Sequence, residues 1–115
     1  AIVSGTYREL IEPMLRQHGI HTHFTQVITR DDVKHPKPDP EGMFLCLTKL
    51  NLKPQDVLFV GDMTIDIDMG RSAGVRTAIL HPYSWSSIED LKERNPDMLI
   101  EKPEDIMTAI QVQHG

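Results

Sequence analysis

The sequence has few of the residues that build disulfide frameworks, metal clusters or basic surfaces. Cys46 is the one cysteine among 115 residues, which excludes an internal disulfide and a zinc site made of several cysteines. Lys and Arg number 12 against 17 Asp and Glu, so the net charge is −5, and we expect no binding to nucleic acid or to an anionic membrane. No apolar run approaches the roughly 20 residues of a membrane helix, and the first residues do not resemble a signal peptide. These absences favour a cytoplasmic protein in a reducing compartment.

The order of apolar segments predicts an α/β fold. A chain of 115 residues is enough for a single domain. Short apolar runs alternate with longer segments of helical periodicity, which is typical of parallel sheets covered by helices. The run at 57–60, VLFV, is apolar at every position, as in a parallel strand buried on both faces. Strands are expected at 1–4, 26–29, 57–60, 77–80 and 98–100, with five helices alternating between and after them.

Capping residues mark where several of these helices begin. Thr6 followed by Glu9 fits a capping box, and so does Ser86 followed by Glu89. Asp39 before a proline is a favourable helix start. We expect helices to begin at these three places.

Three polar clusters lie where a parallel sheet binds ligands, at the carboxyl ends of its strands. Ser4-Gly5 follows the first strand, Lys37 lies in a proline-rich loop, and Asp62 with Asp66 follows the VLFV strand. A hydroxyl, the backbone N–H groups near a glycine and an ammonium group all donate to phosphate. Two carboxylates one helical turn apart suit a hard cation. This combination indicates phosphoryl chemistry assisted by Mg²⁺.

The segments AIVSG, HPKPDPEGM and LFVGDMTIDIDMGRSAGV resemble the second, third and fourth motifs of the haloacid dehalogenase superfamily, in the family's order. The resemblance covers about residues 1–100 and is closest to the phosphoglycolate- or phosphoserine-phosphatase-like members. It implies a Rossmann-like three-layer α/β sandwich with a mostly parallel sheet. It also implies Mg²⁺-dependent hydrolysis of a small phosphate monoester through an aspartyl-phosphate.

The resemblance gives each of the polar residues a role. Ser4 corresponds to the hydroxyl that contacts the transferring phosphoryl group, and Gly5 to a backbone N–H donor beside it. Lys37 corresponds to the lysine that bridges phosphate and nucleophile. Asp62 corresponds to the Mg²⁺ ligand, and Asp66 to the second acid, which supports the lysine or a metal-bound water. The expected catalytic residues are therefore Lys37, Ser4 and Asp66.

The family's first motif, an apolar strand that ends in D-x-D-x-T, is absent from these 115 residues. Asp66-Ile67-Asp68 is predicted to lie in a helix, and Asp31-Asp32 has the wrong spacing. The strand of that motif is central in the family's sheet, between the strands that end at Ser4 and Gly61. We therefore expect residues 1–115 to be a single core-domain fragment, incomplete by one central strand and inactive alone. Its unpaired strand edges favour self-association, and we expect the missing sequence upstream or on another chain.

Other interpretations remain open at this point. A non-catalytic phosphate- and metal-binding regulatory module would retain the pocket without the nucleophile. A receiver-like signalling domain would use Asp62 as phosphoacceptor, but it lacks the expected acidic pair upstream. Among single residues, we expect Cys46 to pack in the core. Tyr83 and Trp85, in the loop after the fourth strand, could edge a substrate pocket, but we expect them to pack instead. The histidines at 18, 21 and 23 are more typical of a solvated surface than of a metal site.

Overall fold

The computed structural model describes the backbone of residues 1–114 and the side chains of residues 1–111, and it divides into two compact units. The first unit is residues 1–52, and the second begins at Lys53. All strand pairs in the described residues are parallel, so the predicted α/β class with parallel strands is confirmed. The strands are β1 (Ile2–Val3), β2 (Val27–Ile28), β3 (Leu58–Gly61), β4 (Arg76–Leu80) and β5 (Met98–Ile100).

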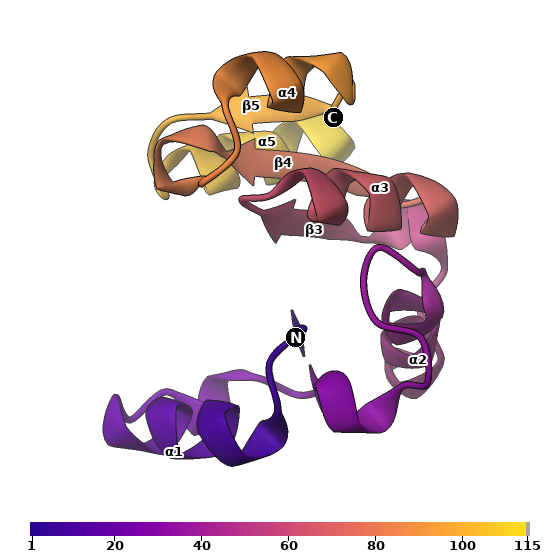
Figure 1. Cartoon of the computed structure of the whole chain (residues 1–115), viewed down its shortest axis with the longest axis vertical. Helices are drawn as coiled ribbons and strands as arrows, with labels where there is room; N and C mark the ends of the chain where they lie inside the picture. The colour runs from indigo at the N-terminus through magenta and orange to yellow at the C-terminus, as the bar shows by residue number, and fades with distance from the viewer. Residues whose placement is uncertain (115) are drawn as a thin grey trace. The chain divides into compact units, whose positions relative to one another are not determined.

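The first unit is built from two short strands and two helices. β1 pairs with β2, with Val3 opposite Ile28, and the helices are α1 (Arg8–Gln17) and α2 (Glu41–Leu50) (Figure 1). The buried apolar side chains of this unit come from α1, β2 and α2: Ile11, Leu15, Ile28, Met43, Cys46 and Leu47. The prediction that Cys46 packs in the core is confirmed, and burial raises the pKa of its thiol.

The start of α1 differs from the prediction. The prediction of a capping box from Thr6 and Glu9 is wrong. The helix α1 begins at Arg8, and the residue before it provides no side-chain cap. The N–H of Thr6 donates to Ser4 Oγ at 3.0 Å. The N–H of Arg8 donates to the carboxylate of Asp31 at 2.7 Å. The cap therefore comes from a distant segment, which the local sequence pattern does not indicate.

The second unit is a three-stranded sheet in the order β3-β4-β5. Its helices are α3 (Thr64–Ala73), α4 (Ile88–Glu93) and α5 (Asp105–His114). Figure 1 shows α3 and α4 in front of the sheet and α5 behind it. Of the helices that the structure describes, none is sufficiently long and apolar to pass through a membrane.

Successive side chains of β4 pack on opposite faces of this sheet, as the period of a strand requires. Ile79 packs with Ile67 of α3 and Leu91 of α4. Its neighbour Ala78 packs with Ala109 of α5. The second unit therefore has the three layers that the resemblance predicts.

The VLFV strand is covered by a helix on each face, α3 on one and α5 on the other, as predicted, but it is less buried than a central strand. All four residues of β3 are half-buried, whereas the three central residues of β4 are buried. In the described residues β3 pairs with β4 and ends its sheet, while β4 has a strand on each side. β1 is paired with β2 and not with β3. Within residues 1–114, β1 and β3 are edge strands, as are β2 and β5, and the resemblance places the missing central strand between β1 and β3.

The loop before α4 also differs from the prediction. Ser87, not Ser86, caps the helix, with its Oγ accepting the N–H of Asp90 at 3.1 Å. Trp85 is 94% exposed and Tyr83 is 60% exposed, so the expectation that these side chains pack is wrong. The loop is held by its own bonds instead, since the Ser84 hydroxyl accepts the N–H of Ser86 at 2.9 Å.

Candidate phosphate- and metal-binding site

In the second unit, a tight turn joins β3 to α3 and carries Asp62. Asp66 lies in the first turn of α3 and is buried. Its Oδ2 accepts the backbone N–H of Asp62 and that of Met63, each at 3.1 Å. A carboxylate at this position also interacts favourably with the amino end of the helix. Asp66 thereby fixes the backbone of Asp62 at the carboxyl end of β3.

Gly61 makes this turn possible. A Cβ atom at Gly61 would lie 2.6 Å from the Cβ, Cγ and Oδ2 atoms of Asp66. Such a contact is far shorter than van der Waals separation, so the carboxylate folds back over residue 61 only because that residue has no side chain. The spacing V-G-D-x-x-x-D is therefore a geometric requirement of one turn, and Asp62 and Asp66 are brought together in it.

The oxygen ligands of this turn suit Mg²⁺, which prefers carboxylate and water oxygens. Asp62 is half-buried at the end of its strand and offers such a carboxylate. Asp66 Oδ2 already accepts two N–H groups. The residue that suits a metal ion is therefore Asp62, whereas the carboxylate of Asp66 supports the turn.

In the first unit, Ser4 and Gly5 lie at the carboxyl end of β1, where they were predicted. The N–H of Ser4 donates to the carbonyl of Ile28 at 2.9 Å, which extends the strand pairing by one residue. Ser4 Oγ accepts the N–H of Thr6 at 3.0 Å, and its own proton remains for another acceptor. Apart from its chain neighbours, no atom of the described residues lies within 4 Å of the Cβ position of Gly5, so no other part of the first unit packs against this point.

Lys37 lies in a turn that precedes α2 and is half-buried. The N–H of Asp39 donates to the carbonyl of Pro36 at 3.0 Å, which closes the turn around Lys37. The peptide bond between Lys37 and Pro38 is cis. Lys37 is therefore placed by a defined loop and not by an extended surface segment.

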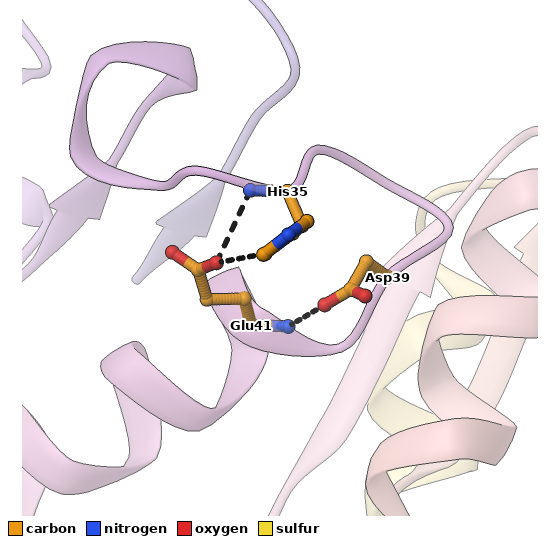
Figure 2. Close-up of side chains that lie close together, drawn as sticks. All are labelled: His35, Asp39 and Glu41. Atoms are coloured by element: carbon orange, nitrogen blue, oxygen red, sulfur yellow. Dashed lines mark hydrogen bonds and ion pairs between the residues drawn. The ribbon is translucent and has the colours of Figure 1, made fainter.

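Glu41 closes that loop from the first position of α2. Its carboxylate accepts the N–H of Lys34 at 2.8 Å and that of His35 at 3.1 Å, and it lies 3.0 Å from His35 Nδ1 (Figure 2). The N–H of Glu41 in turn donates to Asp39 Oδ1 at 2.9 Å. The backbone N–H of Lys34 and the side chain of His35 hold the pKa of Glu41 below its ordinary value.

Within residues 1–111, the His, Cys, Asp and Glu side chains near enough to share a metal ion are His35, Asp39 and Glu41, whose ligand atoms lie within 4.8 Å of one another. The bonds of the Glu41 carboxylate to His35, and of the Glu41 N–H to Asp39 Oδ1, account for this proximity. The histidines at 18, 21 and 23 are exposed, in agreement with a solvated surface.

One polar network was missed by the sequence analysis. The guanidinium of Arg8 donates to Asp32 at 2.7 Å and to the carbonyl of Val27 at 2.8 Å. The hydroxyl of Thr29, which is fully buried, bonds to the carboxylates of Asp31 and Asp32, each at 3.0 Å. The backbone N–H of Arg8 lowers the pKa of Asp31. Burial acts to raise the pKa of Asp32, but the donors Thr29 and Arg8 outweigh it and the pKa is lowered. These carboxylates therefore hold α1 to the loop after β2.

The comparison with known proteins identifies the family. The haloacid dehalogenase-like hydrolase family matches residues 1–80. This chain belongs to that family. The match includes all five predicted site residues: Ser4, Gly5, Lys37, Asp62 and Asp66. The recognition from the three sequence motifs is thereby confirmed.

Similar proteins include several phosphatases. The chain is 37% identical over 106 residues to the pyrophosphatase PpaX of Bacillus velezensis, covering 92% of this chain and 49% of the relative. It is 39% identical over 110 residues to an N-acetylmuramic acid 6-phosphate phosphatase of Pseudomonas putida, covering 95% and 49%. A crystal structure of a predicted phosphoglycolate phosphatase from Haemophilus somnus superposes with a TM-score of 0.82 and 25% identity, covering 94% and 49%. The chain spans about half the length of the curated relatives that it matches.

In this haloacid dehalogenase-like chain, the predicted site residues are divided between the two units. Ser4, Gly5 and Lys37 belong to the first unit, and Asp62 and Asp66 to the second. Each group is described within its own unit. Their convergence on one pocket stays a prediction.

Proposed function

We propose that this chain supplies the phosphate- and metal-binding residues of a Mg²⁺-dependent phosphatase that acts on small phosphate monoesters. The observation that carries the proposal is the turn after β3, in which buried Asp66 fixes Asp62 at the carboxyl end of the strand. Membership of the haloacid dehalogenase-like family supports a hydrolase function. The relatives named as phosphatases support phosphate as the group that is recognised.

Each residue has a distinct part in this proposal. The hydroxyl of Ser4, the backbone at Gly5 and the ammonium of Lys37 donate to the oxygens of the phosphoryl group. Asp62 holds Mg²⁺, which when bound offsets the negative charge that develops on the transferred group. Asp66 keeps the Asp62 backbone in place. The proposal thus assigns the phosphate-binding donors to the first unit and the metal ligand to the second.

Hydrolysis through an aspartyl-phosphate requires a further aspartate at a strand end. Asp62 is assigned to the metal in this proposal, and Asp68 lies within α3, where it forms an ion pair with Arg94. We propose that the nucleophile is not among these 115 residues. Loss of a covalent nucleophile typically costs orders of magnitude in rate, so the 115-residue chain alone is expected to be inactive.

Phosphate binding tests the first part of the proposal. Titration of the purified chain with inorganic phosphate and MgCl₂, followed by NMR, is expected to show saturable binding. Lys37→Ala should weaken that binding by about tenfold or more, because a charge-assisted hydrogen bond is lost. Lys49→Ala removes the same charge from an exposed position on α2 and should leave the affinity unchanged. Equal affinities in the wild type and Lys37→Ala would overturn the assignment of Lys37.

A turnover assay tests the second part of the proposal, that the 115-residue chain alone is inactive. The 115-residue chain with p-nitrophenyl phosphate and Mg²⁺ should release no phosphate above the buffer rate. Steady release at rates normal for a phosphatase would show that the nucleophile lies within these residues.

A second function, a non-catalytic module that binds phosphate and metal, would use the same residues without turnover. Phosphate binding is common to both functions, so turnover by the natural full-length protein separates them. Phosphate release by that protein would support the phosphatase, and binding without release would support the module.

A further inference from the structure

We propose that Glu41 is a positioning residue for Lys37: its carboxylate closes the loop of residues 34–41 and fixes the backbone that carries the ammonium. This inference rests on the proposed phosphate-binding role of Lys37. It assigns Glu41 a task that neither the family motifs nor the sequence pattern indicated.

The first anchor of the loop lies on the amino-terminal side of Lys37. The Glu41 carboxylate accepts the backbone N–H of Lys34 and of His35, at 2.8 and 3.1 Å. Figure 2 shows the carboxylate facing both the N–H and the ring of His35. Two consecutive amides are thereby held by one side chain, two to three residues before Lys37.

The second anchor lies on the carboxyl-terminal side. The turn around Lys37 is closed by the N–H of Asp39 and the carbonyl of Pro36 at 3.0 Å. Asp39 Oδ1 then accepts the N–H of Glu41 at 2.9 Å. Prolines at 36, 38 and 40 restrict φ along the same segment. Both anchors therefore lead to Glu41, one through its side chain and one through its backbone.

Glu41 is itself attached to a packed part of the first unit. The next residue, Gly42, is buried, and a Cβ there would lie 3.2 Å from Val3 Cγ1. The first turn of α2 thus packs directly against β1, the strand that leads to Ser4. Glu41 thereby connects the Lys37 loop to β1, the strand that leads to Ser4, so the two residues proposed to donate to phosphate share one support.

The carboxylate matters more than its ion pair with His35. The side chain of His35 is 69% exposed, and exposed ion pairs contribute little. Backbone N–H groups that donate to a carboxylate make stronger, charge-assisted bonds. Removal of the His35 ring should therefore have a small effect, and removal of the Glu41 carboxylate a large one.

A double-mutant cycle on phosphate binding separates positioning from general folding. Glu41→Ala should weaken binding of inorganic phosphate by about tenfold in the wild type, in line with a lost charged hydrogen bond, and not at all in the Lys37→Ala background. Glu41→Gln should recover part of the affinity, because its amide oxygen still accepts an N–H. His35→Ala, and Glu9→Ala on exposed α1, should behave as wild type. An equal loss in both Lys37 backgrounds, or no loss in either, would overturn the proposal.

A second measurement does not depend on phosphate. Backbone ¹⁵N order parameters for residues 34, 35, 37 and 39 should fall in Glu41→Ala and remain at wild-type values in His35→Ala, with the remaining amide spectrum unchanged. Unchanged order in Glu41→Ala would overturn the positioning role. Loosening of the loop together with phosphate binding that is indifferent to Lys37→Ala would retain the role of Glu41 in the loop and refute the proposed function of Lys37.

Discussion

Gly61 is the residue on which the geometry of the Asp62 turn depends most directly. The Asp66 carboxylate reaches the N–H groups of Asp62 and Met63 by lying over the Cα of Gly61. Any larger residue must displace a buried side chain that already makes its hydrogen bonds. The requirement is therefore steric, and the positive-φ freedom of glycine plays no part in it.

Gly61→Ala is expected to lower the free energy of unfolding by about 1–3 kcal/mol, the usual cost of forcing an additional methyl group into a packed site. Urea unfolding measures the change. Gly5→Ala is the matched control, since apart from its chain neighbours no atom lies within 4 Å of its Cβ position, and it should unfold as the wild type does. Equal free energies of unfolding for the two variants would show that the Asp66 side chain moves aside without loss of stability.

At the residue scale, the sequence predicted which side chains belong to the candidate site but not how they are supported. Ser4, Lys37 and Asp62 were predicted because strand ends and turns are visible in the order of apolar and polar residues. The bonds of Glu41 to Lys34 and His35 cross six or seven residues of irregular loop, which has no periodicity. The bond from Arg8 to Asp32 joins residues 24 apart and has no local pattern at all.

Among the elements, α4 shows how closely two candidate caps resemble each other in sequence. Ser86 and Ser87 both precede an acidic residue by three positions, so the pattern does not discriminate between them. In the structure the N–H of Ser86 bonds to Ser84 Oγ, which places Ser86 in the preceding turn. Ser87 is then the first residue whose Oγ faces the open N–H of the helix, at Asp90.

Ser87→Ala should therefore destabilise the second unit by about 1 kcal/mol, the typical cost of losing an N-cap. Ser86→Ala, one residue away and chemically identical, should have almost no effect. Thermal unfolding followed by circular dichroism compares the two variants. A larger loss in Ser86→Ala than in Ser87→Ala would contradict the cap assignment.

The position of a strand in its sheet could also not be predicted from the sequence. VLFV correctly predicted a parallel strand with helices on both faces, but the depth of burial also depends on which strands lie beside it. β4, which has two neighbouring strands, is the buried one, and β3 ends the sheet. Strand type is a local property of the sequence, whereas strand order depends on the whole chain.

On the scale of the whole molecule, the feature of most consequence is that β1 and β3 end separate sheets. Each presents a row of N–H and C=O groups on the side where it has no strand partner in the described residues. Such edges pair with other chains unless charge, proline or a covering segment blocks them. The residues of β3 are LFVG, which include neither a charge nor a proline.

The chain is therefore expected to self-associate through these edges. Sedimentation velocity over a range of concentrations should show an average mass that rises above that of the monomer. Amide NMR signals of β1 and β3 should broaden with concentration before those of α4, which lies outside the strand edges. Added salt should not dissociate the assembly, because salt screens backbone hydrogen bonds and apolar contacts far less than interactions between surface charges. A single monomeric species at every concentration, with sharp β1 and β3 signals, would refute edge pairing and show that these strands are protected within the chain.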